Sequence, residues 1–144
     1  MPHFPSSTPN DLTHCFVSAS FHADEAMACA MLKTLPEYHD ATIVRSRDAA
    51  VIDSADIVVD VGAVYDPSKH RYDHHQREFR TFFDAQAEKA GIKLSSAGLV
   101  YKHFGKQVIS ILIAQAGYTK GTIMLEAPEN QDPLEIDDLT AIYL

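Results

Sequence analysis

The chain has 144 residues and a formal net charge of −8, with 46% hydrophobic and 22% charged residues. This length and balance predict one globular domain with a core of its own, and no apolar run reaches membrane-spanning length. An acidic surface repels phosphate backbones, so an anionic substrate would have to meet the places where positive charge gathers. These cations are Arg45, Arg47, Lys69, Arg71, Arg77 and Arg80. Charge alone favours the simpler interpretation that they are counter-charges on a solvated face.

The first twelve residues differ in composition from the rest. They contain proline and serine but neither lysine nor arginine, so they match neither a secretory signal nor a mitochondrial transit peptide. We expect a flexible leader at 1–12 and a single domain at 13–144. Cys15 and Cys29 both lie in apolar stretches, which favours reduced core thiols of an intracellular protein over a disulfide.

Short apolar segments alternate with helical patterns along the chain. Strands are expected at 15–20, 42–45 and 56–61, and the continuous β-branched centre of the last is typical of a strand buried on both faces. A buried helix is expected over 26–32. A longer helix should begin near Ser95 or Ser96 and stop at Gly117, with a kink or a division at Gly105. This alternation predicts an α/β fold with a mainly parallel sheet flanked by helices.

Three polar clusters follow positions where predicted strands should end. They are His22 with Asp24, then Asp60, then the triplet Asp73-His74-His75. Ligands of open parallel sheets bind beyond the carboxyl ends of the strands, so we expect the three clusters at one rim. Aspartate and neutral histidine are natural ligands for Mn²⁺ and similar cations. The arrangement therefore predicts a metal site.

Each cluster also has a simpler interpretation. Taken alone, His22 fits a partly buried histidine, Asp24 a helix cap, and the triplet at 73–75 a polar loop. Asp60 is harder to explain in this way, because a carboxylate after a buried strand is costly to bury unless a metal, a base or several N–H groups meet it. A single metal site explains all three clusters together.

Five blocks in order carry a resemblance to a known family. They are SFHADEA at 20–26, VRSRD at 44–48, DIVVDVG at 56–62, YDPSKHRYDHHQR at 65–77 and LSSAGLVYKHFGK at 94–106. In these blocks the chain resembles the DHH-type phosphoesterases, and more closely the family once called metal-dependent protein hydrolases, regarded as 3′-to-5′ RNA exonucleases. The resemblance implies the fold of the N-terminal DHH domain and hydrolysis of phosphodiester bonds in RNA or another nucleic acid.

The resemblance also implies a site with two metal ions, commonly Mn²⁺. On the matching positions, His22 would bind one metal and Asp24 the other, and Asp60 would bridge both. His74 would bind the second metal. Two metals close together can activate a water and clamp an in-line phosphoryl displacement.

Further roles follow from the same resemblance. His75 would meet the scissile phosphate, and Asp73 would orient the histidines. Arg45, Arg47 and Arg77 are candidates to hold phosphate oxygens, with surface ion pairs as an equal alternative.

The chain departs from the family at two places. A family histidine five positions before His22 is replaced by Val17, and a later acidic ligand and a C-terminal domain are missing. We therefore expect a domain truncated at its C-terminus, with bare apolar surface near 109–113 and 142–144 that favours self-association. The alternative to an active exonuclease is a catalytically impaired or inactive truncated paralogue that acts as a metal-binding or interaction module.

Overall fold

The computed structural model describes the backbone of residues 14–17 and the whole of residues 21–117. The expected leader, the side chain of Cys15 and the apolar segment at 142–144 lie outside these residues. In chain order the elements are β1 (His14–Val17), α1 (Ala23–Thr34), β2 (Thr42–Arg45), α2 (Ala49–Asp53), β3 (Ile57–Val59), β4 (Tyr65–Asp66), the 3-10 helix η1 (Pro67–Lys69), β5 (Arg71–Tyr72), α3 (Ala85–Lys89) and α4 (Ser96–Gln115).

The strands form a five-stranded sheet in the order β2-β1-β3-β5-β4. Neighbouring strands are parallel except at the edge, where β4 pairs with β5 in the antiparallel sense. The expectation of an α/β fold with a mainly parallel sheet is confirmed. The β4–β5 hairpin was not expected, because each of its strands has two residues and neither carries an apolar run.

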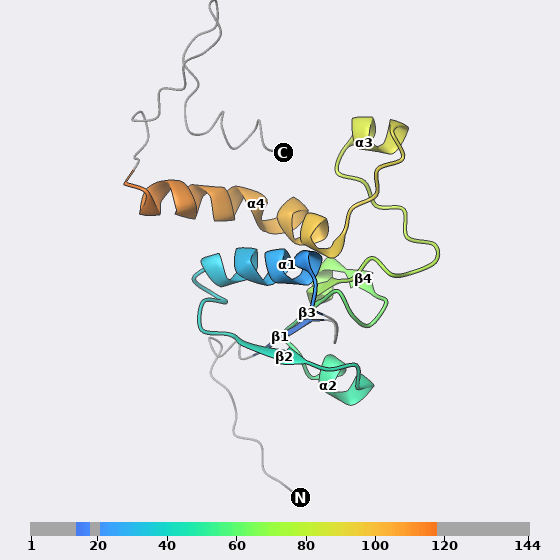
Figure 1. Cartoon of the computed structure of the whole chain (residues 1–144), viewed down its shortest axis with the longest axis horizontal. Helices are drawn as coiled ribbons and strands as arrows, with labels where there is room; N and C mark the ends of the chain where they lie inside the picture. Colours follow the sequence, from blue (N-terminus) through green and yellow to red (C-terminus); the bar gives the residue numbers. More distant parts are fainter. Residues whose placement is uncertain (1–13, 18–20, 118–144) are drawn as a thin grey trace, which may run out of the picture.

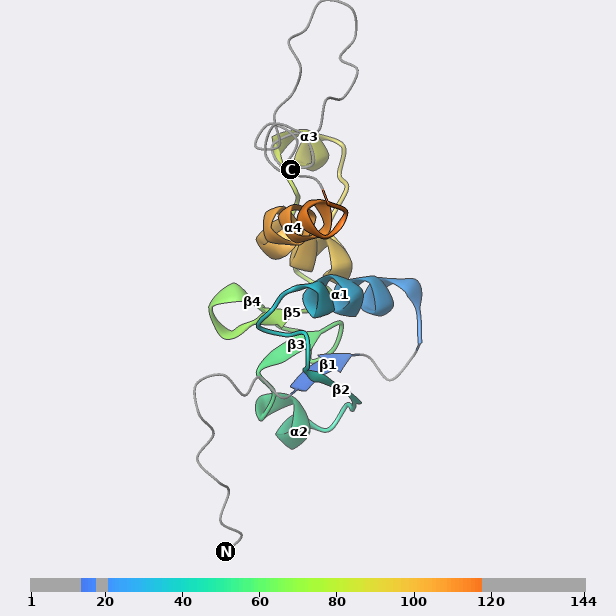
Figure 2. The same ribbon diagram turned by 90° about the vertical axis from the view of Figure 1, so that its left-hand side faces the viewer.

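Helices cover both faces of this sheet. Figures 1 and 2 show α1 and α4 on one face and the short helix α2 on the other. The central strand β3 supplies both cores, since Ile57 and Val59 point into the larger cluster under α1 and α4 while Val58 points into the smaller cluster under α2. All three side chains are buried, which confirms the expectation of a strand buried on both faces.

The two long helices begin and end close to the expected places. Helix α1 is longer than the expected 26–32, and it buries Cys29 as predicted. Helix α4 begins after Ser95, whose hydroxyl oxygen accepts a hydrogen bond from the amide of Gly98 at 3.2 Å. It runs undivided through Gly105, and Gly117 follows its end with a φ of +82°. No helix among the described residues is both long and apolar enough to cross a membrane.

Strand order brings the polar positions together. Asp60 directly follows β3, and Asp73 directly follows the neighbouring parallel strand β5. The residues His22 and Asp24 lie at the start of α1, which packs over the same part of the sheet. The sheet therefore brings together the carboxyl ends at which the sequence placed its three clusters.

Candidate metal centre

Asp60 lies at the middle of the polar cluster, and its conformation is set by the end of β3. Its φ is +58°, in the left-handed region, which aspartate tolerates better than most residues. Its amide donates a hydrogen bond to the carbonyl oxygen of Tyr72 on β5 at 3.1 Å. This hydrogen bond ties the end of β3 to β5. It holds Asp60 in a buried position, with 2% of the residue exposed.

The two carboxylate oxygens of Asp60 have different surroundings. Oδ1 accepts a hydrogen bond from the hydroxyl of Ser96 at 3.2 Å, and the Nδ1 atoms of His74 and His75 lie 3.6 and 3.7 Å from it. Oδ2 is 2.9 Å from His22 Nε2, but no group in the described part of the chain makes a well-aligned hydrogen bond to it. Burial raises the pKa of Asp60, which His22 opposes. A cation at Oδ2 would offset the free-energy cost of burying this carboxylate.

Asp73 orients the second histidine of the triplet. Its Oδ2 accepts a hydrogen bond from the amide of Ala63 at 2.7 Å, and its Oδ1 lies 2.6 Å from His75 Nδ1. The same oxygen accepts from the amide of His75 at 3.2 Å. The hydrogen bond to Asp73 raises the pKa of His75, against a smaller opposing effect of burial. The carboxylate is 1% exposed, so it acts as a fixed support for the imidazole.

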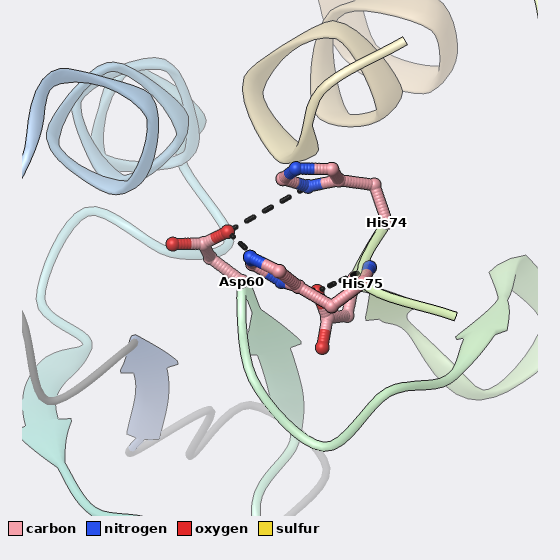
Figure 3. A group of neighbouring side chains, drawn as sticks. Asp60, His74 and His75 are labelled. Atoms are coloured by element: carbon pink, nitrogen blue, oxygen red, sulfur yellow. Dashed lines mark hydrogen bonds and ion pairs between the residues drawn. The ribbon is translucent and has the colours of Figure 1, made fainter. Parts of the chain in front are cut away.

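His74 and His75 lie side by side next to the carboxylate of Asp60. Their ring centroids are 4.3 Å apart and their planes are tilted by 32°. Figure 3 shows both imidazoles turned toward the carboxylate of Asp60. His74 Nδ1 also shares a hydrogen bond with the hydroxyl of Ser96 at 2.9 Å. Ser96, which the sequence marked only as a helix cap, is fully buried. Its hydroxyl links His74 to Asp60 through these two hydrogen bonds.

Asp24 reaches from α1 to the start of α4. Its Oδ2 accepts a hydrogen bond from the amide of Ser96 at 3.0 Å, and its Oδ1 accepts from the amide of Ala97 at 2.7 Å. Its Oδ2 is also 3.7 Å from His74 Nδ1. The simpler interpretation as a helix cap therefore fits, but for a helix more than seventy residues further along the chain. Its role as a metal ligand stays a prediction.

Glu25 is a residue that the sequence analysis missed. Its side chain is fully buried, and its Oε1 forms an ion pair with Arg45, whose guanidinium lies 4.3 Å from the ring centroid of Phe21. Its Oε2 has no hydrogen-bond partner among the described residues. The signal that could have revealed it is periodicity, because positions 25, 28, 29 and 32 share one buried face of α1 and only the first carries a charge.

Six residues supply ligand atoms in two groups that have Asp60 in common. In each group, side-chain ligand atoms lie within 4.8 Å of one another, and the groups are Asp60, Asp73, His74 and His75, and His22, Glu25 and Asp60. Leaving a buried polar atom unsatisfied costs about 1–3 kcal/mol, and Asp60 and Glu25 each have such an oxygen within the described chain. Carboxylate and imidazole ligands suit divalent cations. The residues therefore fit a bound metal.

The three arginines predicted to hold phosphate lie in different environments. Arg47 lines an open pocket of about 380 Å³ together with Asp60, Asp73 and His75. Arg77 is exposed in the segment after the histidines, and Arg45 is held by Glu25. Of the three, Arg47 is thus the one that shares a pocket with Asp60 and His75.

The fold and this cluster define a mixed α/β domain whose acidic and histidine side chains could bind metal ions. The model of a family described as Uncharacterised protein family (UPF0160), the MYG1 exonucleases, matches residues 13–133. The chain belongs to this family. It is 58% identical over 100 residues to the MYG1 protein of Dictyostelium discoideum, covering 69% of this chain and 30% of that protein. It is 53% identical over 98 residues to the MYG1 exonuclease of Homo sapiens, covering 67% of this chain and 26% of that protein.

The chain therefore spans less than a third of the length of these two relatives. No solved structure matches it.

Proposed function

We propose that residues 13–144 form the metal-binding domain of a DHH-type phosphoesterase that hydrolyses nucleic acid, with RNA as substrate and cleavage from the 3′ end. The observation that carries this proposal is the position of Asp60, which belongs to both groups of ligand atoms and keeps a buried oxygen without a hydrogen bond among the described residues. The relative from Homo sapiens is named MYG1 exonuclease, which supports nucleic acid as the substrate class.

The proposed ion is Mn²⁺, held by His22, Asp24, Asp60 and His74. Bound divalent ions supply Lewis acidity and activate a water for attack on phosphorus. Asp60 is placed to serve two ions because its oxygens face different histidines, His22 at Oδ2 and His74 at Oδ1. The backbone amides at the start of α4 compete for Asp24, so Asp24 is the weakest ligand of the four.

His75 is proposed to contact the scissile phosphate. Its Nδ1 is 2.6 Å from Asp73 Oδ1 and 3.7 Å from Asp60 Oδ1, so Nε2 is the nitrogen proposed to meet a substrate. Arg47 is placed to bind a phosphate oxygen because it lines the same pocket as His75 and Asp60. Arg77 would contact the nucleic acid further from the metals.

Metal binding gives the first test. Titration calorimetry of the 144-residue chain with Mn²⁺ should show binding at micromolar or lower concentration. Asp60→Asn should weaken it more than His74→Ala, because Asp60 serves both groups. Glu88→Gln, on an exposed position of α3, is the matched control. The absence of any heat, or equal binding by wild type and Asp60→Asn, would contradict the proposal.

Activity gives the second test. Single-stranded RNA labelled at either end is incubated with the chain and Mn²⁺, with a chelator in a parallel reaction. Loss of nucleotides from the 3′ end that the chelator stops, and that His75→Ala abolishes, would support the exonuclease assignment.

A second candidate is a metal-binding or interaction module without turnover. It is favoured by Val17, which ends β1 beside Arg45 of β2 and offers no ligand atom. Under this alternative the chain binds Mn²⁺ normally but leaves RNA intact. Val17→His would then be the variant expected to raise activity.

A further inference from the structure

Among the described residues, the buried carboxylate of Glu25 has a hydrogen-bond partner for one of its two oxygens. It occupies the face of α1 that also buries Ala28, Cys29 and Leu32, and none of its surface is exposed. Its Oε1 has the guanidinium of Arg45, whereas its Oε2 has no hydrogen bond among the described residues. Buried ionised groups normally find partners for all of their lone pairs, so Oε2 marks a position where a positively charged group fits.

The carboxylate of Glu25 lies close to ligand atoms of two other residues. Glu25 follows His22 by three residues at the start of α1, which places both side chains on one side of the helix. His22 Nε2 is 2.9 Å from Asp60 Oδ2, the other buried oxygen without a hydrogen bond in the described chain. One ligand atom from each of the three residues lies within 4.8 Å of the other two. Two carboxylates, each with one buried oxygen that has no hydrogen bond in the described chain, therefore lie close to one imidazole nitrogen.

Arg45 alone does not balance this charge. It supplies one positive charge and forms an ion pair with Oε1. Glu25 and Asp60 together supply two negative charges, both buried. A neutral His22 adds none, so a single divalent cation at the convergence of the three side chains would satisfy Oε2 and Oδ2 at once. Two carboxylates and one imidazole suit Mn²⁺ and similar borderline-hard divalent ions.

We propose that Glu25 coordinates a divalent metal ion through Oε2, together with His22 and Asp60, while Arg45 holds Oε1 in place. This proposal rests on the metal-dependent function proposed above and adds a ligand to the same centre. Glu25 then binds the ion on the His22 side of Asp60. Asp24, its neighbour in sequence, stays the weakest ligand of the centre because it also accepts hydrogen bonds from the amides that begin α4.

Calorimetric titration with Mn²⁺ distinguishes a failure of this proposal from a failure of the proposed metal-dependent function. Loss of a supporting outer residue lowers metal affinity about 10–100-fold. For a direct ligand, Glu25→Gln should weaken the site by more than about 100-fold or reduce the number of bound ions from two to one. Glu88→Gln should bind as wild type does. If Asp60→Asn and His22→Ala weaken binding but Glu25→Gln does not, Glu25 is not a ligand and the centre stands without it. If Asp60→Asn changes nothing, the proposed function itself fails.

A variant that loses the ion pair with Arg45 could also lose stability, so melting is measured with chelator and with Mn²⁺. If Glu25 has only a structural role, Glu25→Gln lowers the melting temperature in chelator but keeps the upward shift that Mn²⁺ produces. If Glu25 is a ligand, Glu25→Gln loses that shift, because the shift depends on the affinity of the folded state for Mn²⁺. In the unaltered chain labelled with ¹³C, diamagnetic Zn²⁺ should move the carboxylate signal of Glu25 and not that of Glu88. An unmoved Glu25 signal would overturn the assignment.

Discussion

Replacing Asp24 tests whether its carboxylate holds the two long helices together. The side chain accepts hydrogen bonds from the amides of Ser96 and Ala97 at 3.0 and 2.7 Å, and it comes from a different helix. Hydrogen bonds to a charged group contribute about 1.5–3 kcal/mol each. A carboxylate at a helix N-terminus adds about 0.3–1 kcal/mol. Asp24 also raises the pKa of Asp60, so its removal relieves some repulsion.

Because the side chain is 19% exposed, the lower end of these ranges applies. Asp24→Ala should therefore lower the free energy of unfolding by about 3 kcal/mol in the absence of metal. The ordinary cap of the same helix provides the comparison, since the Ser95 hydroxyl accepts one hydrogen bond from Gly98 at 3.2 Å. Ser95→Ala should cost about 1 kcal/mol.

Urea unfolding followed by circular dichroism, with chelator present throughout, measures both differences from the midpoint and slope. Asp24→Asn is a useful third variant because it keeps one acceptor oxygen and should fall between wild type and Asp24→Ala. If Asp24→Ala costs no more than Ser95→Ala, the carboxylate does not support α4. The reasoning that makes Asp24 the weakest of the four proposed metal ligands would then be refuted.

Three further outcomes are expected. Gly105→Ala should destabilise α4 despite the better helix propensity of alanine, because the added Cβ would come 2.8 Å from the ring of Tyr101; equal or greater stability in urea would contradict this. Asp73→Asn should lower the pKa of His75, since Asp73 is the main cause of its raised pKa, and an NMR titration without metal would show an unchanged pKa if this is wrong. The chain should self-associate through α4, where Leu112 is 50% exposed, and Leu112→Glu should reduce this in light scattering across concentration; a clean wild-type monomer would rule it out.

The sequence predicted the parts of the fold that depend on local pattern. The strand at Thr42–Arg45 has the expected bounds, and the apolar run before Asp60 forms the strand buried on both faces. The start of α4 follows from the capping serine, and its end from a glycine with positive φ. Polar residues at the ends of strands could also be recognised, because the parallel sheet brings those ends to one rim.

The contacts that each polar side chain makes could not be predicted in the same way. The sequence marked Asp24 as a ligand, which stays a prediction, but it did not indicate that Asp24 accepts hydrogen bonds from amides at the start of α4. It also overlooked Glu25, which is buried against Arg45. Likewise, Ser96 was expected only to cap a helix, and it joins His74 to Asp60.

Local pattern determines which residues of this chain form strands and helices and which polar side chains stand at their ends, because backbone periodicity and capping act within a few residues. Several partners of those side chains come from segments 20 to 73 residues away, as in the contacts of Glu25 with Arg45 and of Asp24 with Ala97. Such partners meet only after α1 and α4 have packed over the sheet in the order β2-β1-β3-β5-β4. The tertiary structure therefore decided which buried carboxylate oxygens have no hydrogen bond within the described chain and could bind a metal, because hydrogen bonds from distant segments satisfied the others.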